Sequence, residues 1–163
     1  MSISIQGLHH AAYRCRDSEL TRKFYEDFLE LPLVEALPIK TTQTGRKASV
    51  LHTFYQMENG GCIAFFEEPH TPFEFKEQRD FDLHLALEVD YQTLERMMQK
   101  AQTEAISYRG PSDHDFIHSI YFRDPNGYVV ELAATPPDKQ GNGFDPSRAK
   151  DLLAQWQQEK QAS

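Results

Sequence analysis

The chain has few of the features that mark secreted, membrane-spanning or nucleic-acid-binding proteins. Only two of its 163 residues are cysteines, Cys15 and Cys62, and we interpret both as reduced core thiols. No apolar run approaches the roughly 20 residues of a membrane helix, and no signal-peptide pattern is seen. The chain has 17 basic and 25 acidic residues, which disfavours nucleic-acid or anionic-membrane partners. We therefore expect a cytoplasmic protein.

The first half of the chain is predicted to form a strand, a helix and three more strands. A strand is expected over residues 5–15, and Asp17 is the expected N-cap of a helix whose apolar residues recur every four positions. Those residues are Leu20, Phe24 and Phe28. The three following strands are expected over residues 33–39, 48–57 and 62–66.

The second half repeats this order. Residues 82–90 alternate strictly between apolar and polar side chains and end at Asp90, the expected cap of a helix. A short strand over 106–109 and a hairpin follow. An internal duplication explains the repeat. The predicted fold class is therefore α+β, with two tandem βαβββ modules over residues 5–68 and 80–134 that form a groove, followed by a linker and helix over 135–163.

The hairpin, Ser112–Ala134, surrounds one carboxylate. Its turn is Asp124-Pro125-Asn126-Gly127, in which Pro presets φ and Gly accepts a positive φ, so that two strands run antiparallel. Glu131 is predicted to lie on the more polar face of the second strand. Burying such a carboxylate unpaired costs several kcal/mol. It is therefore either solvated at an edge or held by a cation.

Two histidines are predicted to share this polar face. In the strand over 82–90 the leucines face one way, which places His84 on the other face, and His10 lies at the matching position of the first module. Two His and one carboxylate with open positions are typical of non-haem Fe(II) sites, although Mn, Zn or Ni accepts the same ligands. The alternative is two hydrogen-bonded strand histidines and an edge glutamate.

With this duplicated plan, His10, His84 and the segment DPNGYVVEL, the chain resembles the vicinal oxygen chelate superfamily over about residues 5–134. That superfamily includes glyoxalase I, extradiol dioxygenases, fosfomycin-resistance enzymes and bleomycin-binding proteins. The resemblance implies that His10, His84 and Glu131 are metal ligands, with His9 as the rival for the first position. It also implies a metal-dependent enzyme acting on a small molecule.

Within the superfamily, the hairpin looks most like the extradiol dioxygenase signature, which matches here at His114, Tyr121, the Asp124–Gly127 turn and Glu131. The resemblance implies an Fe(II) dioxygenase, an oxidoreductase acting on a small aromatic or chelating substrate. Tyr121 would hydrogen-bond a substrate oxygen, or else serve as a wall residue, and His114 would transfer a proton. Ser112 departs from the signature.

Residues 57–66 also lack the acid/base histidine of extradiol enzymes and, at Ala64 or Phe65, the fourth ligand of glyoxalase I. A glyoxalase-like lyase or isomerase is an alternative, but the missing fourth ligand argues against it. A metal-free sequestering protein is another, in which aromatic residues line the groove: Phe54, Phe65, Phe66, Phe73 and Phe75. His118 is expected to be a satisfied core or edge histidine.

The C-terminal helix is expected to begin at Asp145-Pro146, an N-cap and N1 pair. Leu152, Leu153 and Trp156 form an apolar stripe along it, which requires a partner surface. Because a linker of about ten residues lets the helix reach beyond its own module, we expect a homodimer. The alternative is packing on the helix's own sheet.

Overall fold

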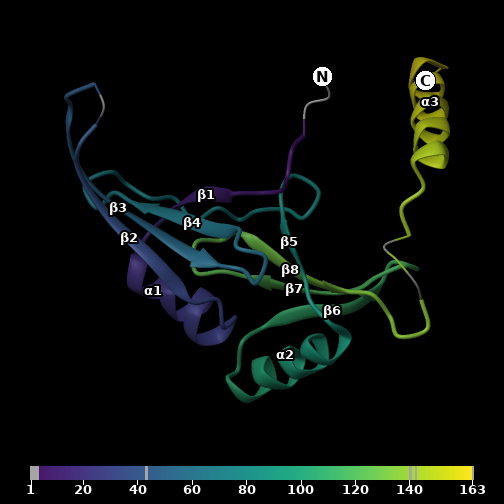
Figure 1. Ribbon diagram of the computed structural model, residues 1–163, viewed down its shortest axis with the longest axis horizontal. Helices are drawn as coiled ribbons and strands as arrows, with labels where there is room; N and C mark the ends of the chain where they lie inside the picture. Colours follow the sequence, from purple (N-terminus) through teal and green to yellow (C-terminus); the bar gives the residue numbers. More distant parts are fainter. Residues whose placement is uncertain (1–3, 43, 140, 142, 163) are drawn as a thin grey trace. The chain divides into compact units, whose positions relative to one another are not determined.

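The computed structural model describes residues 4–42, 44–139, 141 and 143–162, and its elements follow the predicted order (Figure 1). The strands are His10–Cys15 (β1), Leu33–Thr41 (β2), Lys47–Gln56 (β3), Cys62–Glu67 (β4), Leu85–Glu88 (β5), Tyr108–Asp113 (β6), His118–Arg123 (β7) and Val129–Ala134 (β8). The helices are Ser18–Arg22 (α1), the π-helical segment Lys23–Phe28 (η1), Tyr91–Thr103 (α2) and Pro146–Ala162 (α3). The α+β fold class with tandem βαβββ order is confirmed.

The first sheet has the strand order β1-β4-β3-β2. β1 runs parallel to β4, with His10 opposite Cys62, whereas β3 is antiparallel to both of its neighbours. β1 therefore begins at His10, not at Ile5 as predicted from composition, because its partner strand begins only at Cys62.

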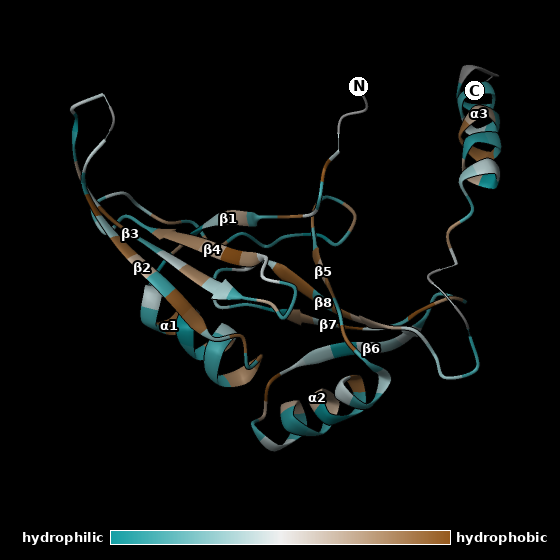
Figure 2. Ribbon diagram, viewed as in Figure 1, coloured by the Kyte–Doolittle hydropathy of each residue, from teal (hydrophilic) through white to brown (hydrophobic). Residues whose placement is uncertain are grey.

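The two faces of this sheet have different roles. On one face Tyr25 of η1 packs on Phe65 and Tyr55, with ring centroids 4.8 and 5.5 Å apart. All three side chains are at most 1% exposed, and each such burial contributes about 1.5–3 kcal/mol. Figure 2 shows β4 as a mostly hydrophobic strand. The opposite face carries His10, His52 and Phe54.

The first helix begins as predicted and then widens. Asp17 Oδ1 accepts the backbone N–H of Leu20 at 2.7 Å, the expected N-cap bond. Beyond Arg22 the helix becomes π-helical, and the N–H of Leu29 donates to the carbonyl of Phe24 at 2.9 Å. This segment buries Phe24, Tyr25 and Phe28. Phe24 and Phe28 of the apolar pattern therefore lie in the core, although the helix that carries them is π-helical and not α-helical.

The second sheet has the order β5-β8-β7-β6. Asp90 caps α2 by accepting the N–H of Thr93 at 2.6 Å, and the apolar face of α2 is buried as predicted, through Leu94, Met97 and Ala101. β5 is shorter than the predicted strand over 82–90. β6 covers Tyr108–Asp113, which corrects the expected strand over 106–109.

The hairpin turn between β7 and β8 forms as predicted. Gly127 has φ 95°, and a Cβ there would lie 2.6 Å from the backbone nitrogen of Lys76. Only glycine fits this conformation and this close approach. The turn closes through the N–H of Gly127, which donates to the carbonyl of Asp124 at 3.0 Å.

The chain divides into two compact units. One comprises the residues up to Leu85 together with Phe122–Val130, and the other comprises Ala86–Tyr121 together with the residues from Glu131 onward. Both cysteines are buried and unpaired, as predicted. Among the described residues, no helix has the length and apolar content needed to span a bilayer.

Candidate functional site

The unit that contains β6 and β7 brings three of the predicted site residues together. His114 lies in the loop after β6, where its backbone N–H donates to the carbonyl of Ile117 at 2.9 Å. Its Nε2 shares a hydrogen bond of 2.9 Å with the hydroxyl of Tyr121 on β7. The loop therefore fixes an imidazole against a phenol, although both residues remain accessible to solvent.

Glu131 on β8 is the third member of this group. It is 4% exposed. Burial raises the pKa of Tyr121, and the negative charge of Glu131 and a hydrogen bond to its carboxylate raise it further. Because a carboxylate only accepts, the Tyr121 hydroxyl donates to Glu131 and accepts from His114 Nε2–H in this arrangement.

Arg109 and Ser119 complete the surroundings of Tyr121. The guanidinium carbon of Arg109 lies 4.1 Å from the centroid of the Tyr121 ring, and its positive charge lowers the pKa of Tyr121. Ser119, two residues before Tyr121 on β7, is fully buried. A hydrogen bond between its hydroxyl and Tyr121 also lowers the pKa of Tyr121. Phenol, imidazole, guanidinium, hydroxyl and carboxylate are thus gathered at one place.

His10 begins β1 and lies among other rings. Its Nδ1 is 2.8 Å from the Nδ1 of His9, and its ring centroid is 6.3 Å from that of His52 and 5.7 Å from that of Phe54. One of the two Nδ1 atoms must donate to the other. His10 is exposed on the sheet face opposite the η1 core.

His84 lies immediately before β5, not inside a strand as predicted. Asp82 and Leu83 form a turn by donating to the carbonyl of Arg79. The Nδ1 of His84 lies 2.7 Å from the carbonyl oxygen of Asp80, so Nδ1 carries the proton and Nε2 carries the lone pair. This is the hydrogen bonding that orients metal-binding histidines.

A narrow cavity of about 10 Å³ adjoins His84, which is room for one water molecule. It is lined by Tyr13, Tyr25, Gln78, Leu83, His84, Leu85, Tyr128, Val129 and Val130. It is therefore too small for a substrate.

The structure brings Tyr121, His114 and Glu131 together in one unit, whereas His10 and His84 belong to the other. Within the part of the chain that the structure describes, no three His, Cys, Asp or Glu side chains are grouped so as to hold a metal ion. The donor types nevertheless fit a divalent cation, with two imidazoles and a buried carboxylate. The assignment of His10, His84 and Glu131 as ligands stays a prediction.

His118 is satisfied as expected. Its Nδ1 lies 3.1 Å from the hydroxyl of Tyr91, and its Nε2 lies 3.7 Å from Asp113.

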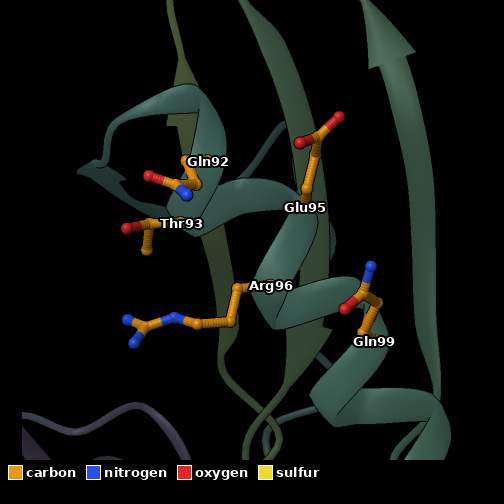
Figure 3. Close-up of a pocket in the computed structure, with 5 residues that line it drawn as sticks. All are labelled: Gln92, Thr93, Glu95, Arg96 and Gln99. Atoms are coloured by element: carbon orange, nitrogen blue, oxygen red, sulfur yellow. The ribbon is translucent and has the colours of Figure 1, made fainter.

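A larger hollow, of about 520 Å³, lies on the surface of α2 (Figure 3) and is lined by Gln92, Thr93, Glu95, Arg96 and Gln99. All five residues come from one helix and none is His or Cys, so we assign no chemistry to this hollow.

Three residues of these surroundings were missed in the sequence. His52 alternates with Thr53 along β3, so the same parity argument used for His84 would have placed it on the His10 face. Its Nδ1 donates to the carbonyl of Phe65 at 3.0 Å, and its ring stacks on Phe66 at 3.7 Å. Arg109 gave no comparable signal, because the predicted strand there ended at residue 109. Ser119 lies on the predicted hairpin strand, on the same face as Tyr121, but its residue type gave no sign of a role.

The aromatic residues considered for a sequestering pocket divide between core and surface. Phe65 is fully buried in the core, whereas Phe75 is 49% exposed. Phe54 and Phe66 both contact His52, on the His10 face. Phe73 lies beneath the ammonium of Lys76, 5.3 Å from it.

The duplicated βαβββ order is that of a glyoxalase-like fold. The model of the Glyoxalase/Bleomycin resistance protein/Dioxygenase superfamily matches residues 7–132. The chain therefore belongs to this superfamily, the vicinal oxygen chelate proteins. No curated protein matches the chain at a significant level.

Solved structures share this fold at low identity. A glyoxalase/dioxygenase from Nostoc punctiforme is 23% identical, with 83% of this chain and 98% of that chain covered and a TM-score of 0.63. A glyoxylase/bleomycin resistance protein/dioxygenase domain from Frankia sp. EAN1pec is 17% identical, with 83% and 96% covered and a TM-score of 0.64. The fosfomycin resistance protein FosX from Listeria monocytogenes, with Mn(II) and sulfate, is 18% identical, with 83% and 97% covered and a TM-score of 0.60.

Proposed function

We propose that the protein is a metal-dependent enzyme, an Fe(II) extradiol-type dioxygenase that acts on a small aromatic or otherwise chelating substrate. The observation that carries this proposal is the 2.9 Å contact between His114 Nε2 and the Tyr121 hydroxyl, beside the buried Glu131. An imidazole beside a tyrosine hydroxyl supports a role in which Tyr121 binds a substrate oxygen and His114 transfers a proton.

His10, His84 and Glu131 are the proposed ligands of the cation. When bound, a divalent metal supplies open positions for two oxygens of a chelating substrate and for O₂. Asp80 orients the imidazole of His84 so that Nε2 faces away from the backbone, and His9 can do the same for His10. Fe(II) is proposed for this chain, and Mn(II), which FosX binds, or Zn(II) or Ni(II) suits the same donors.

Tyr121 and His114 are the proposed acid–base pair. The hydroxyl of Tyr121 hydrogen-bonds a substrate oxygen, and His114, which carries a proton at Nε2, donates this proton and later takes it back. The rival glyoxalase-like chemistry needs a further polar ligand on β4. Ala64 and Phe65 stand there, and both are fully buried apolar residues, which supports a site with three protein ligands.

Anaerobic reconstitution with Fe(II), followed by oxygen-uptake measurements across a panel of catechols, tests the proposal. The expected result is stoichiometric metal uptake, with oxygen consumption in the presence of at least one catechol. The oxygen consumption should be lost in the Tyr121→Phe and His114→Gln variants. Metal uptake without oxygen consumption would move the protein to the lyase, isomerase or hydrolase branches. If neither Fe(II), Mn(II) nor Zn(II) binds tightly, a metal-free sequestering role replaces the enzyme.

A homodimer is part of the proposal. Every described side chain of α3 from Pro146 to Lys160 is exposed, and so is its apolar stripe, with Leu152 at 52%, Leu153 at 60% and Trp156 at 59%. Such a stripe is stable in water when it is covered. The second copy of the chain is the proposed cover.

A further inference from the structure

His52 is a buried imidazole on β3 that the proposed function does not use. It is 8% exposed, and its Nδ1 donates to the carbonyl oxygen of Phe65 at 3.0 Å. We propose that His52 is a specificity-determining residue, whose Nε2 accepts a hydrogen bond from a hydroxyl or N–H group on the ring of an aromatic substrate. This inference rests on the proposed function, because it takes His10 as a ligand of the cation that binds the substrate.

The hydrogen bond to Phe65 determines which ring nitrogen of His52 is available. A carbonyl oxygen only accepts, so Nδ1 carries the proton and Nε2 of the neutral ring carries a lone pair. Nε2 has no hydrogen-bond partner among the residues that the structure describes. It is not one of the atoms sealed from solvent, so a donor on a bound molecule reaches it in place of water. Polar atoms of largely buried side chains are normally paired, and this lone pair therefore indicates a donor that the chain itself does not supply.

Two phenylalanines fix the plane of the His52 ring. Phe66 stacks on it, with ring centroids 3.7 Å apart and an interplanar angle of 10°. The ring of Phe54 lies 4.2 Å away at an angle of 53°. These contacts and the hydrogen bond to β4 leave the imidazole little freedom, so the direction of its lone pair is constant. An acceptor that is already fixed loses little conformational entropy when a donor binds.

The neighbours of His52 on its face of the first sheet are apolar. The register pairs His52 with Phe66 and Leu37, and it pairs Phe54 with Ala64. Directly paired residues project from the same face of a sheet. This part of the face is therefore an apolar surface with one hydrogen-bond acceptor, a combination that is common in binding sites for small molecules.

His10 lies on the same face, with its ring centroid 6.3 Å from that of His52 and 5.7 Å from that of Phe54. A substrate held by a cation at His10 is therefore next to His52 and its aromatic neighbours. An acceptor among apolar groups discriminates between substrates, because a substrate without a donor leaves the acceptor without a hydrogen bond. The substrate class is chelating aromatic molecules with a further donor beyond the two chelating oxygens.

Anaerobic calorimetry on the full-length, Mn(II)-loaded protein tests this inference with two matched pairs of catechols. The first pair is 1,2,4-trihydroxybenzene and 4-methylcatechol, and the second is 1,2,3-trihydroxybenzene and 3-methylcatechol. A methyl group is close to a hydroxyl in size, but it neither donates nor accepts a hydrogen bond. At least one triol should bind about 3–10-fold more tightly than its methyl partner. The pair with the larger ratio gives the ring position that faces His52.

Variants connect this preference to His52. His52→Phe keeps an aromatic ring against Phe66 and removes the acceptor, so the ratio should fall to one or below. His70→Phe is the matched control, because His70 is exposed in the turn after β4, and it should leave the ratio unchanged. Thermal unfolding of each variant checks that it is folded.

Nitrogen-15 NMR of the wild-type protein tests the same contact without a substitution. The Nε2 resonance of His52 should shift when the preferred triol binds, because the lone pair becomes hydrogen-bonded, and it should not shift with the methyl partner. If His52→Phe does not fold, this shift decides the role of His52.

The outcomes separate this inference from the proposed function. Metal uptake with equal affinity for both members of each pair overturns the inference and leaves the proposed function intact. A triol preference that survives in His52→Phe, or that comes without a shift of the Nε2 resonance, overturns the role of His52. If the wild-type protein takes up no metal, the proposed function fails, and the same titrations on the metal-free protein then decide whether His52 selects a donor. No binding of any probe overturns the inference.

Discussion

The hydroxyl of Tyr25 donates a 3.1 Å hydrogen bond to Asp124 Oδ2, across 99 positions of the sequence. Tyr25 belongs to η1 and Asp124 opens the β7–β8 turn, and both are at most 2% exposed. The other oxygen of Asp124 accepts the backbone N–H groups of Asn126 at 2.9 Å and Tyr128 at 2.8 Å. One buried carboxyl group therefore joins the first helix to the turn that precedes the strand of Glu131.

Tyr25→Phe should destabilise the protein by about 1–3 kcal/mol, because it removes one of the two donors to the buried Oδ2 of Asp124 and leaves only the side-chain amide of Asn126. Urea unfolding monitored by circular dichroism measures this loss. Tyr108→Phe is the matched control, because its hydroxyl accepts a 3.1 Å bond from Gln102 at an exposed site. The control should change stability by about 0.5 kcal/mol or less. Equal effects of the two substitutions would contradict the importance assigned to the Asp124 contact.

The stability contributed by Asp124 should depend on pH. Burial raises the pKa of its carboxyl above the ordinary 3.8, against hydrogen bonds from Asn126 and Tyr128 that lower it. The folded state therefore binds the proton more tightly than the unfolded state does. The resulting stability is fully present below the unfolded pKa and is lost as the pH rises through the folded pKa.

Asp124→Asn, which stays neutral, should consequently gain stability relative to the wild type as the pH rises from below the ordinary carboxyl pKa of 3.8 toward neutrality. Urea midpoints of both proteins across this range give the difference. Carboxylates whose pKa is lowered, such as Glu26, are present in both proteins and cancel. A difference that is constant with pH would exclude Asp124 as the titrating group.

The proposed ligands make a sharp prediction about metal content. Glu131→Ala and His84→Ala should each abolish tight metal binding, whereas His118→Ala should not, because His118 is held by Tyr91 and Asp113. Elemental analysis after dialysis and calorimetric titration with Mn(II) measure this. Stoichiometric metal in the His84 variant would end the assignment.

The first ligand is tested by a pair of neighbouring substitutions. His10→Ala should lose the metal, and His9→Ala should keep most of it, with affinity reduced by about 10-fold if His9 only orients the His10 ring. The two Nδ1 atoms lie 2.8 Å apart, so the residues are close enough to exchange roles. The reverse result would transfer the ligand role to His9.

Removal of α3 should weaken association without loss of metal. The expected full-length protein is a dimer at micromolar concentration, and truncation at Asp138 should shift it toward monomer because the exposed stripe of Leu152, Leu153 and Trp156 is removed. Sedimentation velocity and metal analysis of both forms test this. A full-length monomer would contradict the dimer, and an unchanged dimer after truncation would show that α3 does not hold it together.

The elements whose signals are local were predictable from the sequence. Asp17, Asp90 and Asp145 were expected as N-caps, and each accepts backbone N–H groups of the turn that follows it. The Asp124–Gly127 turn was equally predictable, since Pro125 and Gly127 determine its backbone. Capping and turn formation depend on residues within four positions, so the sequence alone contains the information.

Strand ends and side-chain partners were not predictable in this way. β1 begins at His10 because β4 begins at Cys62, and no local pattern records where a partner strand starts. His84 obeys the alternation of the strand that follows it, although a turn at Arg79 places it outside that strand. The residues around Tyr121 come from three neighbouring strands and a loop, so Arg109 could be placed beside Tyr121 only once β6 was located at Tyr108–Asp113.

The hairpin turn also determines when the first module can complete its hydrogen bonds during translation. The backbone N–H of Arg16 donates at 2.9 Å to the side chain of Asn126, which lies 110 positions later. The segment between β1 and α1 therefore leaves the ribosome well before Asn126, which accepts the hydrogen bond of Arg16, has been synthesised. Contacts of such long sequence separation form slowly, and an incomplete chain that ends before the turn leaves Tyr25 without its acceptor. The nascent first module must remain unaggregated until the last hairpin of the domain emerges.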